Sequence, residues 1–112
     1  MEIKYFVQNF TLSDEDKDFL EEKIKKLTHF SDKIWEAKAD LSYNPNHSKN
    51  QLFRVEVNLR MPNKILRAVS RASHFQAAVM DIEKILQRQL RRYKGFRLLR
   101  RRFAQKFLKR RK

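Results

Sequence analysis

The sequence predicts an α+β fold in the order β-α-β-β-β-α: a four-stranded sheet with two helices packed on one face, followed by a basic tail. Apolar residues at every second position mark four segments as strands, and apolar residues three or four positions apart mark two segments as helices. Polar residues occupy the alternate positions of the middle strands, so one face of the sheet meets water and both helices must cover the other.

The first strand is predicted over residues 2–9, where Ile3, Tyr5 and Val7 share one face. Phe6 lies on the opposite face, which suggests that this second face is not fully solvated.

The first helix is predicted over about residues 14–28. Ser13 is a suitable N-cap, and the acids of the first turns and the lysines of the last turn complement the helix dipole. Leu20, Ile24 and Leu27 form its apolar stripe.

Three further strands are predicted over residues 34–43, 52–61 and 64–70, and the short connections between them favour antiparallel pairing. Pro62-Asn63 predicts a tight turn between the last two. On the inner face of residues 34–43, two alanines leave room for a helix. The rings of Trp35 and Tyr43 lie on the same face and are expected to pack in the core.

The second helix is predicted to start at a Ser73 cap and to stop, or hinge, at Gly95. This divides the chain into a domain of residues 1–95 and a basic amphipathic tail of residues 96–112. The tail keeps a helical pattern, but its charges repel one another, so we expect it to order on an anion.

The net charge of +14 lies wholly in the stretch from Lys84 to Lys112, which has fourteen Lys and Arg residues and no acid. Residues 1–83 carry thirteen basic and thirteen acidic residues. So concentrated a charge attracts polyanions and speeds their capture.

Other function classes find little support. The absence of cysteine excludes disulfides and thiolate metal sites and fits a cytoplasmic protein. The three histidines show no ligand spacing, and no nucleophile–base pair or phosphate loop is present, so we expect no catalytic site, metal or cofactor. No secretory signal or membrane-spanning run is evident.

The basic residues of the second helix and tail are therefore the candidate site, and we expect them to bind the phosphates of structured RNA, with ribosomal RNA the favoured partner. Lys84, Arg88, Arg91 and Arg92 recur at helical spacing and form one face. The predicted set continues with Lys94, Arg97, Arg100, Arg101 and Arg102. Trp35, Tyr43 and Tyr93 could stack on bases, although core packing is favoured for Trp35 and Tyr43. The interleaved Phe and Leu of the tail also describe a helix lying on anionic lipid, an alternative that we disfavour.

Several stretches together resemble the ribosome hibernation promoting factor family, which includes the ribosome-associated inhibitor protein Y. The segment LSDEDKDFLEEKIKKL resembles the family's first helix, and Ile65 to Ala68 stands where the family has its fourth strand. The segment ILQRQLRRYK resembles the end of the family's second helix. Its matching residues are Arg88, Gln89, Leu90, Arg92 and Lys94.

The resemblance implies a non-enzymatic factor that binds the small ribosomal subunit and its rRNA where mRNA and tRNA would lie, and so keeps idle ribosomes inactive under stress. It implies that Lys23 and Lys26 also contact rRNA. The helix sequence alone favours another interpretation, in which these lysines are solvated and complement the helix dipole. The other class left open is a constitutive structural RNA-binding protein that uses the same basic helix.

Three departures from the family stand out. The segment HFQAAVMD matches the start of the family's second helix only at Ala78 and Val79. A length of 112 residues leaves no room for the dimerisation domain of the long form, so we expect a short form that is monomeric off the ribosome. The tail is longer and more basic than the family predicts.

Overall fold

The computed structural model describes the backbone of residues 1–110 and the side chains of residues 1–48 and 50–93. The elements confirm the predicted β-α-β-β-β-α order. They are β1 (Glu2–Gln8), α1 (Asp14–Lys26), β2 (Glu36–Tyr43), β3 (Phe53–Met61), β4 (Lys64–Ala72) and α2 (Phe75–Arg110). A 3₁₀ turn, Leu27–His29, follows α1, and another, Lys49–Gln51, precedes β3.

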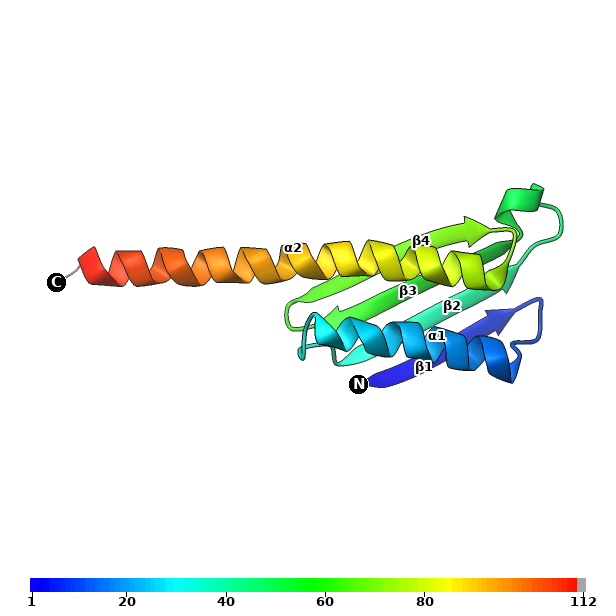
Figure 1. The fold of residues 1–112 in the computed structure, drawn as a ribbon, viewed down its shortest axis with the longest axis horizontal. Coiled ribbons are helices and arrows are strands. Elements are labelled where there is room, and N and C mark those ends of the chain that lie inside the picture. The colour runs from blue at the N-terminus through cyan, green and yellow to red at the C-terminus, as the bar shows by residue number, and fades with distance from the viewer. Residues whose placement is uncertain (111–112) are drawn as a thin grey trace.

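The four strands form one mixed sheet in the order β1-β2-β3-β4 (Figure 1). β1 and β2 are parallel because α1 carries the chain back between them, whereas β2–β3 and β3–β4 are antiparallel. The two-residue turn Pro62-Asn63 joins β3 to β4, and Asn63 takes a φ of 62°. Proline followed by a residue with positive φ is the pattern of a type II turn.

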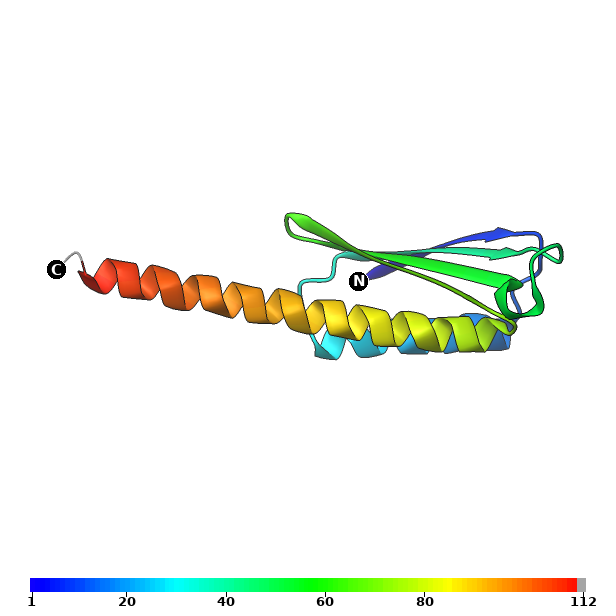
Figure 2. The same ribbon diagram turned by 90° about the horizontal axis from the view of Figure 1, so that it is seen from above.

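Both helices cover the same face of the sheet, as predicted (Figure 2). Leu20 and Ile24 of α1 and Ile82, Leu86 and Leu90 of α2 are buried against it. Ala37 and Ala39 of β2 are fully buried, as expected of small residues placed under a helix.

Two local contacts fix α1. Ser13 Oγ accepts a hydrogen bond of 3.1 Å from the Asp16 backbone N–H, which confirms the predicted cap. Tyr5 donates its hydroxyl to Glu21 Oε1 at 2.7 Å and so ties β1 to the helix. Burial, together with this neighbouring carboxylate, raises the pKa of Tyr5 well above its ordinary value.

Three expectations were wrong. Trp35 is 56% exposed, because β2 begins at Glu36 and the strand alternation does not extend back to the tryptophan. The first backbone bond of α2 runs from Ala78 N–H to His74 C=O, so His74, not Ser73, precedes the helix. Finally, α2 continues through Gly95, since the glycine keeps a negative φ instead of turning the chain.

Candidate nucleic-acid interface

α2 presents two opposite faces. Its buried face consists of Val79, Ile82, Leu86 and Leu90, at helical spacing. Lys84, Arg88, Arg91 and Arg92 are exposed and lie roughly half a turn away, on the side that faces water. The predicted grouping of these four cations on one helix face is thus present in the structure. We call them the α2 cation face.

Three members of this face have no acidic partner. Among the described side chains, no ion pair or hydrogen bond involves Lys84, Arg88 or Arg92. After Glu83 the sequence contains no acid at all. The repulsion between these charges is therefore relieved only by counterions or by a polyanionic partner.

Arg91 differs from the other three. Its guanidinium carbon lies 5.4 Å from the centroid of the Phe30 ring, just beyond the 3₁₀ turn that follows α1. This cation–π contact holds the arginine beside α1 while its charge remains exposed.

Lys23 is held between the two helices. Its ammonium lies 3.7 Å from Glu83 Oε2 of α2 and 5.2 Å from the centroid of the Phe19 ring. Its side chain is only 19% exposed. The structure thus gives Lys23 a role in joining α1 to α2, and its charge is already offset.

Lys26 is intermediate between Lys23, which is shielded and paired, and the exposed cations of the α2 cation face. It pairs with Glu22 one turn earlier at 3.5 Å, and both side chains remain largely exposed. α1 and α2 run in the same direction, so the C-terminal end of α1, at Lys26, lies toward the end of the sheet beyond which α2 extends (Figure 1). The remaining predicted residues lie on the backbone of α2, and their side chains are outside the described part. They are Lys94, Arg97, Arg100, Arg101 and Arg102.

The predicted stacking aromatics do not join the α2 cation face. Tyr93 is partly buried against the core. Tyr43 is half-buried and packs on Phe53 with ring centroids 5.0 Å apart, at the margin of the core.

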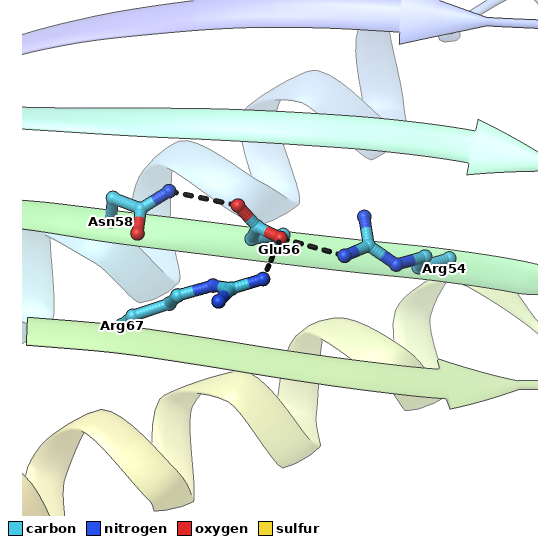
Figure 3. Close-up of polar contacts among 4 residues, drawn as sticks. All are labelled: Arg54, Glu56, Asn58 and Arg67. Carbon is cyan, nitrogen blue, oxygen red and sulfur yellow. Dashed lines mark hydrogen bonds and ion pairs between the residues drawn. The ribbon is translucent and has the colours of Figure 1, made fainter.

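The sheet carries a polar cluster that sequence reasoning missed (Figure 3). Glu56 Oε1 accepts hydrogen bonds from Arg54 at 2.6 Å and from Arg67 at 2.9 Å, and Oε2 accepts one from Asn58 at 3.1 Å. The bonds from Arg67 and Asn58, with Arg54 beside them, lower the pKa of Glu56 to about 2. The two-residue spacing of Arg54 and Glu56 was visible in the sequence, but Arg67 arrives only through the β3–β4 register.

Two other kinds of site find no support in the described residues. Within residues 1–110, no helix is both long and apolar enough to cross a membrane. Among the described side chains, no three His, Asp or Glu residues gather as metal ligands would.

Comparison with known proteins completes the description. Residues 3–97 match the family described as Sigma 54 modulation protein / S30EA ribosomal protein. The chain belongs to this family. The resemblance seen in the helix motifs is thereby confirmed.

Two curated relatives carry the name ribosome hibernation promotion factor. The one from Deinococcus radiodurans is 30% identical over 87 residues, which is 78% of this chain and 46% of the relative. The one from Staphylococcus aureus is 31% identical over 86 residues, which is 77% of this chain and 44% of the relative. The chain therefore spans about half the length of the curated relatives that it matches.

Solved structures share the fold. The N-terminal domain of Thermus thermophilus Protein Y superposes with a TM-score of 0.71 at 22% identity, covering 83% of this chain and 99% of that one. A ribosomal subunit interface protein from Coxiella burnetii gives 0.70 at 20% identity, covering 85% and 99%. At these identities the likeness establishes the fold alone.

Proposed function

We propose that this chain is a ribosome hibernation factor that binds rRNA of the small ribosomal subunit in the channel used by mRNA and tRNA, and so holds idle ribosomes inactive. The observation that carries the proposal is the α2 cation face, where Lys84, Arg88 and Arg92 are exposed and meet no acidic partner among the described side chains. The names of the curated relatives support the same biological setting.

The mechanism is steric and electrostatic. The arginines of the α2 cation face grip phosphates through bidentate hydrogen bonds, and the counterions released on contact supply much of the affinity. The apolar face of the helix meanwhile stays in the core, so binding requires no unfolding. A chain bound in this way occupies the space that mRNA and tRNA need.

The distal part of α2 adds further positive charge to the sequence. Residues 96–112 contain nine Lys and Arg residues and no acid, and the described backbone continues as helix to Arg110. We propose that residues 1–95 dock on the subunit and that the tail follows the mRNA path. A chain that ends at Lys94 is expected to bind more weakly and with a shallower salt dependence. Equal affinity and equal slope would refute a role for the tail.

Cosedimentation with vacant ribosomes tests the main proposal. The full chain is expected to pellet with the small subunit and to be released by mRNA together with initiator tRNA. Binding that ignores both ligands would contradict the channel proposal and favour a structural RNA-binding protein. A constant occupancy of ribosomes in growing and starved cells would point the same way.

A further inference from the structure

We infer that the face of the sheet away from the helices is a second RNA-binding surface, which takes one unstacked base of a single strand beside Phe6 and grips the adjacent phosphates with arginines of β3 and β4. This surface is separate from the α2 cation face and goes beyond the proposed function. Five features of the uncovered face carry the inference. They are a hollow over β2, the ring of Phe6, the carboxylate of Asp40, the arginines of β3 and β4, and Glu56, which orients two of these arginines.

The hollow lies over β2, on the uncovered face. Its volume is about 220 Å³, which is room for a single planar base. The side chains that line it from this face are Phe6, Gln8, Asp40, Ser42 and Arg54.

Phe6 supplies the stacking platform. The ring is 49% exposed although it lies on a regular strand. The Lys38 ammonium lies over one face of the ring, 4.8 Å from its centroid, so a base would stack on the other face or displace the lysine. Aromatic rings next to cations are the usual platform for unstacked bases, because every base offers a flat π-face.

Asp40 supplies a hydrogen-bond acceptor. It lies directly opposite Phe6 on one side and Glu56 on the other. Glu56 is neutralised by its arginines, whereas Asp40 has no ion-pair or hydrogen-bond partner among the described residues. A carboxylate repels phosphate but accepts two N–H groups, and the base edge that offers two adjacent N–H donors is that of guanine.

The arginines of β3 and β4 supply the phosphate grip. Arg54 borders the hollow and lies directly across from Arg71, and Arg67 reaches the same area from β4. Arg71 also contacts His47 at 3.5 Å. Glu56 lies between Arg54 and Arg67 and fixes both guanidinium groups through a single oxygen (Figure 3). Glu56 is therefore a positioning residue, and the N–H groups that it does not use remain for phosphate.

The pattern favours RNA over a protein partner. A docked protein needs a contiguous apolar patch, but Phe6 and Val69 stand apart, with two carboxylates between them in the same cross-strand row. The half of the face formed by β3 and β4 carries four arginines against one glutamate. An exposed aromatic ring can stack on a base, and the neighbouring arginines can bind the phosphates next to that base.

Photocrosslinking tests the inference with the full chain. The probe is a uridine heptamer with a central guanosine and one flanking 4-thiouridine. Peptides are mapped after irradiation in the Arg88→Gln/Arg92→Gln variant, which weakens binding through α2. We expect crosslinks in the segment that contains Phe6. Phe6→Ala is expected to weaken this crosslinking about tenfold. Ile65→Ala, the matched control at a 64% exposed position on the same face, is expected to leave it unchanged.

Two further arms identify the ligand. Asp40→Asn is expected to remove the preference for the guanosine heptamer over plain uridine heptamer. Free guanosine monophosphate is expected to compete at least tenfold more weakly than the heptamer. Equal competition would overturn the single-strand assignment. Crosslinks confined to α2 and insensitive to Phe6→Ala would overturn the site itself, while leaving displacement by mRNA and tRNA as a separate test of the proposed function.

Discussion

Two groups of cations in this molecule differ in what surrounds them. On the sheet, Arg54 and Arg67 share one oxygen of Glu56, and between the helices Lys23 meets Glu83. On α2, Lys84, Arg88 and Arg92 meet no acid among the described residues. The first group stabilises the fold because each cation contacts a carboxylate within it, although Arg54 and Arg67 together exceed Glu56 by one charge. The second group is repulsive in the free protein, so its favourable energy appears only when a polyanion binds.

The sharpest test removes two charges from the α2 cation face and compares this with the removal of two paired lysines from α1. Arg88→Gln/Arg92→Gln is expected to weaken ribosome binding about tenfold to a hundredfold and to lower the salt slope by about 1.5, because two phosphate contacts are lost. Its free energy of unfolding should change by less than about 0.5 kcal/mol, as for other surface changes. Cosedimentation over a salt series, with urea unfolding alongside, measures both.

Lys23→Gln/Lys26→Gln is the matched control, with the same change of formal charge. We expect a weaker effect on ribosome affinity because both lysines already have acidic partners. If this variant loses as much affinity as Arg88→Gln/Arg92→Gln, internal pairing does not decide which cations bind, and the comparison fails.

Removal of the Glu56 charge is expected to change stability, whereas removal of charges from the α2 cation face is expected to change ribosome binding. Glu56→Gln should cost about 2 kcal/mol of stability at pH 7, because bonds to a charged acceptor become bonds to a neutral one. The folded pKa of about 2 lies below the ordinary 4.5, so this stability is present above pH 4.5 and is lost as the pH falls toward 2. Urea unfolding of the unmodified protein and of Glu56→Gln at pH 7, 4.5 and 3 should show that the difference between their free energies of unfolding shrinks as the pH falls.

Glu36→Gln is the control for this prediction. Glu36 pairs with Lys4 on the same face, but the lysine is 49% exposed and solvent screens the pair, so we expect a much smaller loss than for Glu56→Gln. A stability difference for Glu56→Gln that stays constant from pH 7 to pH 3 would contradict the assigned cause.

These contrasts also explain what the sequence could reveal. Alternation and helical spacing suffice for the element order and the α2 cation face, since both are periodic and local. The Glu56 cluster depends on which residue of β4 lies beside β3, and the Lys23–Glu83 pair depends on how two helices lie together. Neither is encoded in spacing along the chain. Trp35 was misplaced because one residue decides whether a strand has begun.

The Lys23–Glu83 pair predicts a smaller effect. Lys23→Met should cost about 1 kcal/mol, because Glu83 Oε2 is buried without a hydrogen-bond partner among the described residues and would lose its only counter-charge there. Lys23→Met/Glu83→Leu should recover most of that loss, since neither charge then remains. A double mutant no more stable than Lys23→Met would show that packing, not charge, sets the effect. Thermal unfolding of the three proteins decides the matter.

Lys26→Gln should have the smallest effect on stability. Its pair with Glu22 spans one turn in the favourable order, with the acid first, and such exposed pairs contribute about 0.3–0.5 kcal/mol. The loss should vanish in concentrated salt, which screens exposed charges, whereas the loss from Lys23→Met should persist because that pair is shielded from solvent. Urea unfolding of both variants with and without 1 M salt makes the comparison. If 1 M salt removes both losses of stability equally, Lys23 is no better shielded from solvent than Lys26. Lys23 would then be as accessible to RNA as Lys26.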